Sequence, residues 1–582
     1  MIYQNYIRVL YIDMETEKIR IDEREDLKKY MGGVGVASKL LEENMKPNLP
    51  PLDPSQPIVL AIGALNSVFP VVTKVVAMFI SPLTGELGES YAGGRLGLAM
   101  FSAGYDAIVI TNKAKRPSYL TISPNNISVR DARPLWGSEK DNVGRIIRDE
   151  ERDKGGKRSI IRIGLGGENM VSYACVTVDR YRHFGRLGLG AVFGSKFLKA
   201  INLIGGREVP IQNFKEYFKT WREIEDICTK SDFMTKYHDV GTPINVSPLN
   251  AAGGLPTRNL RQNRFDDAHK IDGEVFSTHH QIRKMACAGC PVACIHIAQL
   301  RREFADHGHE YEAISVAYDF ELIFALGTFL GINDPLQILE LIEEVELAGL
   351  DAMSTGVVLG WATEALEAGL VTLKDTIEPL KFGSHKEYCK AVHHIATGEN
   401  EFYKTLGKGS KHAAEVYGGE DFAMQIGGNE MAGYHTGYGS LTGMAVGARH
   451  SHLDNGGYSI DQSMKDLNID EMVDSLLKEE VERCMLNSLI ICLFARKVYD
   501  RKTILSAFKA IGENMTDEEL TAVARRNYAT KLRIKKALGF DLKDIKLPKR
   551  FFKTPSMRGM LDEKVAYEIV DKFRERIREF DD

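Results

Sequence analysis

The sequence has little cysteine and tryptophan and no long apolar run. Its 582 residues include 8 cysteines and 3 tryptophans. The longest apolar stretches, residues 58–64 and 489–495, are far shorter than the roughly 20 residues that a membrane-spanning helix needs. Charges at Arg8, Asp13, Glu15 and Glu17 leave no room for the apolar core of a signal peptide. We therefore expect a soluble cytoplasmic protein with no membrane partner.

Neither positive nor negative charge is in large excess. Lys and Arg number 75 against 80 Asp and Glu, which gives a net charge of -5. This balance argues against a general polyanion-binding surface, so no nucleic-acid partner is expected. Hydrophobic residues make up 44% and charged residues 27%, close to the globular average, which excludes wholesale disorder. The length favours three to four domains.

The pattern of expected secondary structure changes near residue 210. Before it, short β-rich runs such as 7–12, 58–62, 75–80 and 107–111 alternate with glycine turns, which predicts an antiparallel or mixed sheet. After it, helical patterns dominate, for example 213–228, 336–348 and the pattern that follows the capping box of Thr516 and Glu519. We predict an α+β fold with a β-rich domain at 1–210 and helical domains at 211–415 and 416–582.

Three of the cysteines form a C-x2-C-x3-C cluster at Cys287, Cys290 and Cys294. In a reducing compartment such a cluster favours a metal or redox site over a disulfide framework. Both zinc and an iron–sulfur cluster accept four thiolates, and the spacing favours the iron–sulfur cluster. The spacing does not choose the fourth ligand among Cys175, Cys228, Cys389, Cys484 and Cys492, and core burial is the alternative for each of them.

Glycine is concentrated in residues 84–104 and 185–194. Neither segment has the spacing of a P-loop or of a dinucleotide-binding fingerprint. Tight turns are one interpretation. The other is close backbone approach to a phosphorylated cofactor, which Lys74, Arg182 and Arg186 beside these segments support.

Eight stretches, taken in order, resemble the tungsten-containing aldehyde:ferredoxin oxidoreductase family over essentially the whole chain. They are SPLTGELGESYAGG (81–94), AGYDAIVI (103–110), RYRHFGRLGLGAVFGSKFLKAI (180–201), CAGCPVAC (287–294), HEYEA (309–313), GLDAMSTGVV (349–358), RHSHLDNGGY (449–458) and NSLIICLF (487–494). The resemblance implies a β-rich saddle that carries a bis-pterin tungsten cofactor (tungstopterin), one [4Fe-4S] cluster, and two helical domains that cover them.

The resemblance also assigns residues. It implies cluster ligation by Cys287, Cys290, Cys294 and Cys492, and a magnesium ion bridging the pterin phosphates through the carbonyls of Tyr91 and His183. Further pterin contacts are implied at Lys74, Gly93, Arg182, Gly185, Arg186, Glu346, Leu350, Asp351, His452, Asn487 and Ile491. Glu346, Asn487 and Lys74 depart from the family pattern, which has aspartates in place of the first two and arginine in place of the third.

For catalysis the resemblance implies Glu312, in the triplet Glu310-Tyr311-Glu312, as the base that activates water, and His452 beside the metal. Tyr434 and His435 are candidates for orienting substrate, and His450 competes with His452. The predicted reaction oxidises an aldehyde to a carboxylic acid with water and passes electrons singly to ferredoxin or a small iron–sulfur subunit. The alternatives are a thioester reductase of the benzoyl-CoA type and a non-catalytic zinc- or cluster-stabilised scaffold. An oligomer or heteromer is compatible with each.

Overall fold

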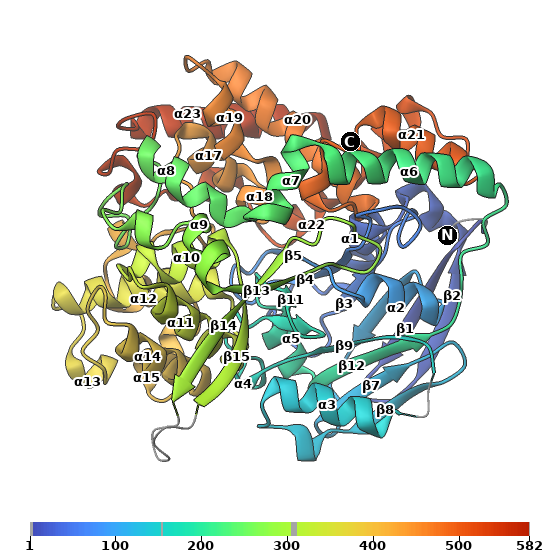
Figure 1. Ribbon diagram of the computed structural model, residues 1–582, viewed down its shortest axis with the longest axis horizontal. Coiled ribbons are helices and arrows are strands. Elements are labelled where there is room, and N and C mark those ends of the chain that lie inside the picture. The colour runs from blue at the N-terminus through green and yellow to red at the C-terminus, as the bar shows by residue number, and fades with distance from the viewer. Residues whose placement is uncertain (1–3, 153–154, 304–310, 581–582) are drawn as a thin grey trace.

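The computed structural model describes residues 4–152, 155–303 and 311–580. Figure 1 shows a β-rich N-terminal part, helical segments from the middle of the chain beside it, and the C-terminal helices along one side of both. The predicted α+β class, with strands first and helices afterwards, is confirmed. The predicted domain limits stay predictions, although the last strand of the N-terminal part ends at Gly205 and the next helix begins at Phe214.

The N-terminal part contains two six-stranded mixed sheets. The first runs in the order β2 (Ile19–Arg24), β1 (Ile7–Asp13), β6 (Ala107–Thr111), β3 (Ile58–Ala61), β4 (Val75–Ile80) and β5 (Leu87–Ala92), with one parallel pair, β1 and β6. The second runs β11 (Arg182–Phe184), β10 (Val176–Val178), β9 (Lys157–Arg162), β12 (Leu198–Gly205), β7 (Ser118–Ile122) and β8 (Ile127–Asp131), with β12 and β7 parallel. The edge strands β5 and β11 pack against each other, so the sheets meet there.

Helices cover the first sheet because its central strands are apolar on both faces. Every residue of β3 and β4 is buried. Helix α1 (Gly33–Asn44) packs on both strands and is covered in turn by α20 (Ile469–Ser488) and α22 (Asp517–Ala537). A side chain at Gly33 would put its Cβ 2.3 Å from the carbonyl oxygen of Asn487. Glycine there lets the end of α20 reach the sheet.

The remaining helices of the N-terminal part are short. They are α2 (Leu96–Ala103), α3 (Lys140–Glu150), α4 (Leu165–Glu168) and α5 (Leu189–Ser195). Helix α2 packs on β12 and β9, and α3 packs on β9. The second sheet is therefore covered from within its own part of the chain.

The middle segment, in its described part, has helices as its regular elements apart from one three-stranded antiparallel sheet. Its helices are α6 (Phe214–Lys230), α7 (Asp232–Asp239), α8 (Val246–Ala252), α9 (Gly273–Val275), α10 (Phe320–Leu326), α11 (Pro335–Ala348), α12 (Ala352–Glu367), α13 (Leu373–Thr376), α14 (His385–Thr397), α15 (Glu401–Leu406) and α16 (Ser410–Tyr417). The sheet pairs β13 (Gln281–Met285), β14 (Ile295–Glu303) and β15 (Tyr311–Tyr318). The sequence prediction missed it because charged residues interrupt the apolar alternation of β13 and β14.

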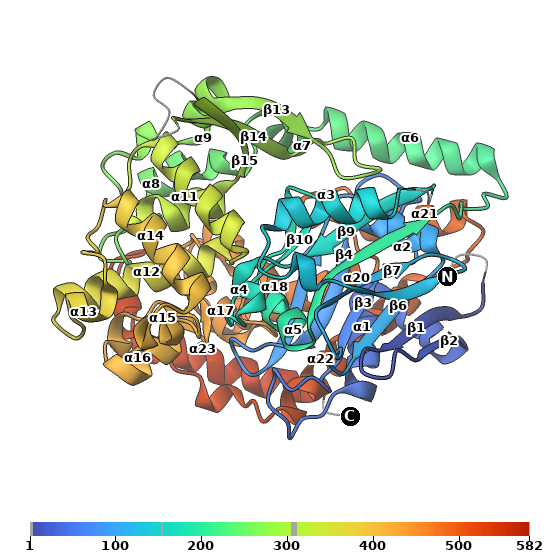
Figure 2. The same ribbon diagram turned by 90° about the horizontal axis from the view of Figure 1, so that it is seen from below.

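The C-terminal part begins with the hairpin of β16 (Gln425–Ile426) and β17 (Asn429–Glu430). Its helices are α17 (Tyr438–Val446), α18 (His452–Asn455), α19 (Gly457–Ser463), α20, α21 (Arg501–Ala510), α22 and α23 (Glu563–Arg576). The predicted capping box is confirmed: Thr516 accepts from the Glu519 N–H, and the Glu519 carboxylate accepts from the Thr516 N–H. Figure 2 shows the last of these helices, α22 and α23, in red along the lower side of the view, below α1.

No single helix among the described residues is long and apolar enough to span a membrane. The segments Phe320–Leu330 and Pro335–Ala348 reach that length and composition only as a pair, and the pair is bent by 110°.

Candidate functional site

The cysteine loop and the predicted fourth cysteine meet at Val71. The Val71 N–H donates to the Gly289 carbonyl at 3.3 Å, and the Val71 carbonyl accepts from the Cys492 N–H at 3.1 Å. Val71 also has a φ of +59°, which is a strained value for a β-branched residue. The structure therefore holds Cys492 beside the loop of Cys287, Cys290 and Cys294, although almost 200 residues separate them in sequence.

The loop is also fixed to the N-terminal part at Gly93 and Gly94. The Gly94 N–H donates to the Cys287 Sγ at 3.2 Å, and the Gly94 carbonyl accepts from the Ala288 N–H at 2.9 Å. A Cβ on Gly93 would lie 2.7 Å from the Cys287 Sγ and 3.1 Å from the Lys74 Nζ. Glycine at position 93 thus lets Cys287 and Lys74 lie against the same stretch of backbone.

The surroundings of the four thiols differ. Burial opposes ionisation of Cys287, but Lys74, Arg182 and the Gly94 N–H together lower the pKa of this thiol. The pKa of Cys294 is raised to about 11, first by burial and then by the nearby Cys492. Burial, followed by the other three thiols, raises the pKa of Cys290. All four cysteines therefore lie within electrostatic range of one another, with the cationic side chains nearest to Cys287.

In the part of the chain that the structure describes, no three His, Cys, Asp or Glu side chains converge as ligands of a single metal ion do. A zinc ion would need its sulfurs about 2.3 Å from one point. A four-iron cluster is larger than one ion, and its thiolates stand further apart around it. The other cysteines are ordinary packing residues: Cys175, Cys228 and Cys484 are buried and Cys389 is half-buried.

The predicted phosphate and magnesium contacts lie where the two sheets meet. Tyr91 belongs to β5 and His183 to β11, the edge strands that pack together. The Tyr91 hydroxyl donates to Glu89 at 2.6 Å, and the Arg449 guanidinium lies 5.2 Å from the centre of the tyrosine ring. A Cβ on Gly185 would meet no atom within 4 Å, so the backbone there faces open space.

Two charged pairs join this edge to the helices of the middle part. Glu346 accepts from the Lys140 Nζ at 2.8 Å and lies 3.0 Å from the His183 Nε2. Burial by itself raises the pKa of Glu346, but the charges of His183 and Lys140 lower it by more. The pKa therefore lies below its usual value, and this carboxylate stays ionised.

The second pair consists of Arg186 and Asp351. The Arg186 Nε donates to the Asp351 carboxylate at 3.0 Å, and the same guanidinium donates to the Glu430 carbonyl at 2.9 Å. Asp351 also begins α12 as its N-cap, because it accepts from the Met353 N–H at 3.1 Å. The predicted cofactor contacts thus hold one another in place.

The remaining predicted cofactor contacts lie on the same boundary between parts of the chain. Leu350 pairs with Ala174, and Ile491 pairs with Val72, each through an isolated antiparallel bridge. Asn487 is buried in the last turn of α20, with its carbonyl against Gly33. Arg182 lies beside Gly94.

A carboxyl and an imidazole form the most unusual pair of the site. The Glu321 Oε1 lies 3.2 Å from the His452 Nε2. Burial, followed by the charge of nearby Asp319, raises the pKa of Glu321 to about 8. Burial and then Arg186 lower the pKa of His452 to about 3. At neutral pH the pair is therefore an uncharged carboxyl beside a neutral imidazole, not an ion pair.

Aromatic rings border this pair. Tyr434 stacks on Tyr458 with ring centres 4.3 Å apart, and its ring centre lies 5.4 Å from that of His452. Phe320, which precedes Glu321, lies 5.1 Å from Tyr434. Apart from the 3.2 Å approach of the His452 Nε2 to the Glu321 Oε1, which is not a hydrogen bond, this Oε1 and the His452 Nδ1 are buried without a partner among the described residues. Two polar atoms thus remain available to a ligand within an aromatic surround.

The structure does not bring Glu312 to this group, which argues against its predicted role. Glu312 lies on β15, paired with Arg302 at 3.2 Å, and its side chain is 44% exposed. The end of β15 near the cysteine loop is marked by Tyr318, which pairs with His296 and lies six residues after Glu312 on the same strand. At about 3.3 Å per residue, Glu312 lies roughly 20 Å along the strand from that end. The Glu312 side chain therefore stands partly in solvent, paired with Arg302, and not within the aromatic surround of the Glu321–His452 pair.

His435 is also placed away from the pair. Its imidazole is fully buried, and its Nε2 lies 2.9 Å from the Thr554 carbonyl. Burial lowers the pKa of His435 to about 4. The ring is held toward the C-terminal segment, and the predicted role of His435 in orienting substrate stays a prediction. His450 likewise turns away, with its Nδ1 at the Met444 carbonyl and its Nε2 at Glu86.

The sequence contains a signal for Glu321 that the prediction overlooked. Asp319-Phe320-Glu321 repeats the acidic–aromatic–acidic pattern of Glu310-Tyr311-Glu312 nine residues later, directly before a buried helix. Asp319 caps that helix by accepting from the Leu322 N–H. The two triplets differ in burial: Glu321 stands in the first turn of a buried helix, whereas the Glu312 side chain is 44% exposed on a strand. Lys140, which neutralises Glu346, had no recognisable pattern of its own.

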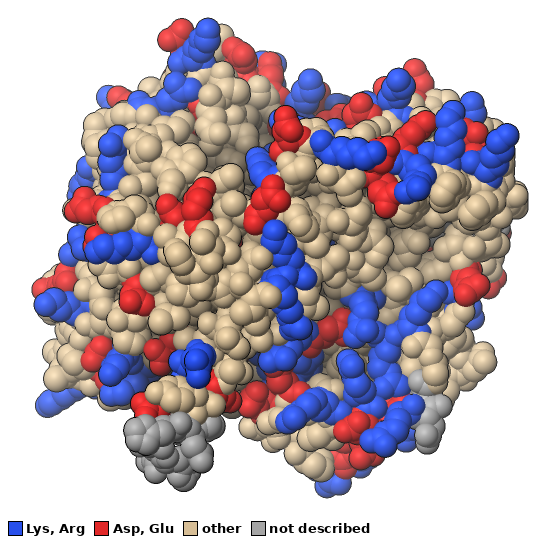
Figure 3. Space-filling view, in the orientation of Figure 1, with Lys and Arg blue, Asp and Glu red and all other residues tan. Residues whose placement is uncertain are grey.

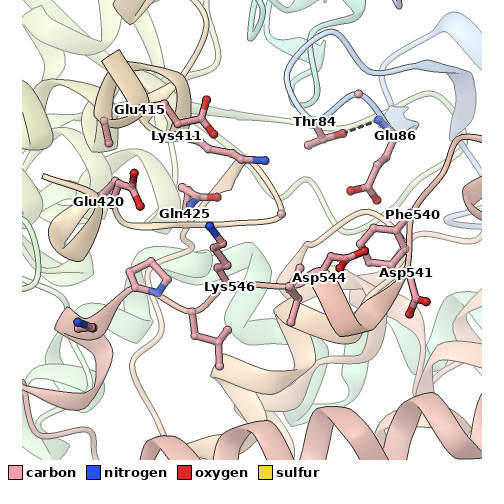
Figure 4. Close-up of a pocket in the computed structure, with 18 of the residues that line it drawn as sticks. Thr84, Glu86, Lys411, Glu415, Glu420, Gln425, Phe540, Asp541, Asp544 and Lys546 are labelled. Carbon is pink, nitrogen blue, oxygen red and sulfur yellow. Dashed lines mark hydrogen bonds between the residues drawn. The ribbon is translucent and has the colours of Figure 1, made fainter. Parts of the chain in front are cut away.

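A cavity of about 650 Å³ opens elsewhere, where segments from all three parts of the chain meet (Figure 4). Glu86 on its wall lies 2.9 Å from the Lys535 Nζ and 3.2 Å from the His450 Nε2. None of the predicted site residues lines this cavity. It is therefore not the candidate site.

Comparison with known proteins agrees with this architecture. The model of the aldehyde ferredoxin oxidoreductase N-terminal domain matches residues 9–205, and the model of domains 2 and 3 of the same enzymes matches residues 219–580. These matches define an oxidoreductase. The protein belongs to the aldehyde ferredoxin oxidoreductase family.

Its relatives include tungsten-containing aldehyde ferredoxin oxidoreductases of Pyrococcus furiosus and Thermococcus kodakarensis. Each is 30% identical over 96% of this chain and 93% of its own length. A WOR-like subunit of the aliphatic sulfonate oxidoreductase of Pyrococcus furiosus is 33% identical over 70% of this chain and 66% of its own. Among solved structures, the active site complex BamBC of benzoyl coenzyme A reductase with 1,5 dienoyl-CoA superposes with a TM-score of 0.84 at 19% identity, covering 100% of this chain and 97% of that chain. This last likeness concerns the fold.

Proposed function

We propose that the protein oxidises an aldehyde to the carboxylic acid with water as the oxygen source. The overall change converts RCHO and H2O into RCOOH, two protons and two electrons. The observation that carries the proposal is the Glu321–His452 pair, a proton-binding carboxyl with its pKa near 8 beside a neutral imidazole within an aromatic surround. Full-length relatives named as aldehyde ferredoxin oxidoreductases support the substrate class.

The residues present fit a bis-pterin metal cofactor and a [4Fe-4S] cluster. The glycine backbone at Gly185 faces open space, and Tyr91 and His183 belong to the edge strands β5 and β11, which pack together. Four thiols lie within electrostatic range beside Lys74. Arg182, Arg186, Glu346 and Asp351 would hold the phosphates and the pterin rings. When bound, the metal cofactor would supply a two-electron acceptor, and the cluster would supply a one-electron path out of the protein.

Glu321 would take a proton from the attacking water. Its Oε1 is the atom without a hydrogen-bond partner, while its Oε2 accepts from the Gly433 N–H at 3.1 Å, which fixes the rotation of the carboxyl. The neutral His452 would donate or accept a hydrogen bond at Nδ1, its unpartnered nitrogen. Tyr434 and Tyr458 would hold the carbonyl compound against the pair and exclude bulk water. Such a carboxyl, with its pKa near the working pH, is suited to acid–base catalysis.

An assay with simple aldehydes and a small dye as electron acceptor, on protein produced anaerobically with tungstate, tests the proposal. Formation of one carboxylic acid for every two electrons transferred is the expected result. Reduction of an aryl-CoA thioester or oxidation of an aliphatic sulfonate in place of the aldehydes would assign the chain to another reaction within its family. Protein that is free of tungsten and pterin after such growth would favour the scaffold alternative.

A further inference from the structure

A groove of about 900 Å³ lies directly beside the cysteine loop, between α3, the turn from β10 to β11 and the sheet β13–β15. Met285 and Ala286, the two residues before Cys287, line it, and so do Gly94 and Arg182, which lie against the loop. Ala286 and Gly289 are exposed. The groove is therefore a surface from which the predicted cluster is reached through few atoms.

Eight arginines and five carboxylates line this arginine groove. The arginines are Arg95, Arg145, Arg148, Arg162, Arg180, Arg182, Arg283 and Arg302, and the carboxylates are Glu139, Asp141, Asp179, Glu312 and Glu343. Burial raises the pKa of Glu343 to about 7, which weakens its negative charge at neutral pH. The groove is thus positive on a protein whose net charge is -5.

The positive surface extends beyond the groove on both sides. A smaller cavity shares Arg95 and Arg148 with it and adds Lys157 and Arg158. Lys236, on the other side of the cysteine loop, lies near Arg496 and Lys497. Burial first, and then these two cations, lower the pKa of Lys236. That second group is held beside Cys492 by the stacking of Tyr237 on Phe494 at 4.4 Å. Figure 3 shows basic side chains running down the middle of this face, over β13 and toward α3.

Most of the groove's arginines reach solvent, although Arg162 is buried. Arg95 and Arg180 are 53% and 54% exposed, and their nearest carboxylates, Asp179 and Asp141, stand 3.7 and 3.6 Å away. Arg145 and Arg148 are exposed on α3. Long-range attraction between such exposed charges and a charged partner speeds encounter and orients it, while the net charge of the whole chain repels the same partner elsewhere.

We propose that the arginine groove and the adjoining loop 286–289 form the docking surface for a small acidic iron–sulfur protein that takes electrons from this enzyme. This inference rests on the proposed function, since it needs an enzyme that releases electrons. Oxidation of one aldehyde yields two electrons and two protons, and a one-electron carrier removes them in two encounters. Electron transfer slows steeply with distance, so a carrier docked over Ala286 occupies a productive position next to Cys287.

The test compares a groove variant with a matched control. The triple variant R95E/R148E/R180E reverses three exposed charges of the groove, none of which is a predicted cofactor contact. The double variant K404E/K408E reverses two exposed charges at the end of α15, which lies away from the groove in both ribbon views. Each protein is assayed with benzyl viologen, and with a purified acidic two-cluster ferredoxin at low and at high salt.

We expect the groove variant to keep the dye-linked turnover of the wild type while its KM for the ferredoxin rises about tenfold or more at low salt. The wild-type KM should rise with salt, because a Debye length of about 10 Å at 0.1 M screens exposed charges. The control should match the wild type. Calorimetric titration with oxidised ferredoxin provides a readout independent of turnover, and the groove variant should bind at least tenfold more weakly.

Three results would overturn the docking surface. They are an unchanged ferredoxin KM and affinity in the groove variant, an equal loss in the control, and reduction of the dye but not of the ferredoxin by the wild type. A groove variant that loses affinity for benzoyl-CoA and keeps its ferredoxin affinity would instead assign the groove to a phosphate-bearing coenzyme. Loss of dye-linked aldehyde oxidation in the wild type would refute the proposed function and not the docking surface, since ferredoxin binding is measured separately.

Discussion

The Glu321 Oε1 lies 3.2 Å from the His452 Nε2, although the two residues belong to different parts of the chain. Glu321 is in the first turn of α10, and His452 begins α18. The contact joins the helical middle part to the C-terminal part. Arg186 of the N-terminal part lies nearby, and its charge, after burial, lowers the pKa of His452. Assembly of the three parts is thus a condition for forming the pair.

The first prediction separates Glu321 from Glu312. The substitution Glu321→Gln preserves shape but removes the proton-accepting carboxylate, so turnover should fall about 100-fold or more, within the range of general acid–base catalysis. Glu312→Gln is the matched control, because this carboxylate is exposed and paired with Arg302. Turnover per tungsten is the measurement. An unimpaired E321Q enzyme, or an E312Q enzyme with the larger loss, would remove Glu321 from its assigned role.

The second prediction concerns pH. The base form of Glu321 is the deprotonated one, and its pKa is about 8. Below that pH, each unit should reduce kcat/KM about tenfold, and above it the rate should level off. The rate falls toward low pH because the Glu321 carboxyl becomes protonated below its pKa and can then no longer accept a proton. A rate profile of the wild type against pH measures the limb, and the residual rate of E321Q should show no such limb.

The sequence predicted the framework of the site better than its catalytic centre, and the reason is physical. Cys287, Cys290, Cys294, Arg182 and Arg186 stand in glycine-rich or closely spaced motifs that constrain the local backbone. In the structure Cys287 lies against the Gly94 N–H, and Arg186 donates to Asp351. The carboxyl was different, because two acidic–aromatic–acidic triplets compete and only burial distinguishes them. Glu321 is at a helix start under Tyr434, and Glu312 faces solvent on a strand.

Sequence alone could not have supplied the contacts that join distant segments. Val71 contacts both Gly289 and Cys492, and Lys140 reaches Glu346 across more than 200 positions. No local pattern marks such partners, since each side chain is ordinary for its own helix or loop. The β13–β15 sheet was missed for a related reason: β13 is mostly polar, and its pairing with β14 joins segments on either side of the cysteine loop.

The third prediction concerns the fourth cluster ligand. Cys492→Ala should lower the iron content and abolish the electron paramagnetic signal of a reduced [4Fe-4S] cluster, because Cys492 lies beside the cysteine loop. Cys484→Ala is the control: this cysteine lies on helix α20, before Cys492 in the chain, and is buried in the core. Its iron content should equal that of the wild type. Equal iron in both variants would exclude Cys492 as a ligand.

The fourth prediction assigns His435 to stability. His435→Ala removes the contact of the Nε2 with the Thr554 carbonyl and leaves a buried acceptor unpaired, which costs about 1–3 kcal/mol. The thermal midpoint should therefore fall, while turnover per tungsten at a temperature well below it stays within about twofold. Calorimetry and the aldehyde assay on the same preparation measure the two effects. Loss of turnover in a variant with unchanged thermal stability would restore His435 to the catalytic set.

The fifth prediction concerns the ring and the hydroxyl of Tyr434. The structure gives the ring a defined contact, since it stacks on Tyr458 at 4.3 Å and lies beside His452. Tyr434→Phe keeps that stack and should leave kcat/KM for an aromatic aldehyde within about threefold. Tyr434→Ala removes a ring contact of about 0.5–1.5 kcal/mol beyond its buried area, and should raise KM for that aldehyde about tenfold. The two variants share the missing hydroxyl, so an equal loss in both would mean that the hydroxyl, and not the aromatic wall, positions the substrate.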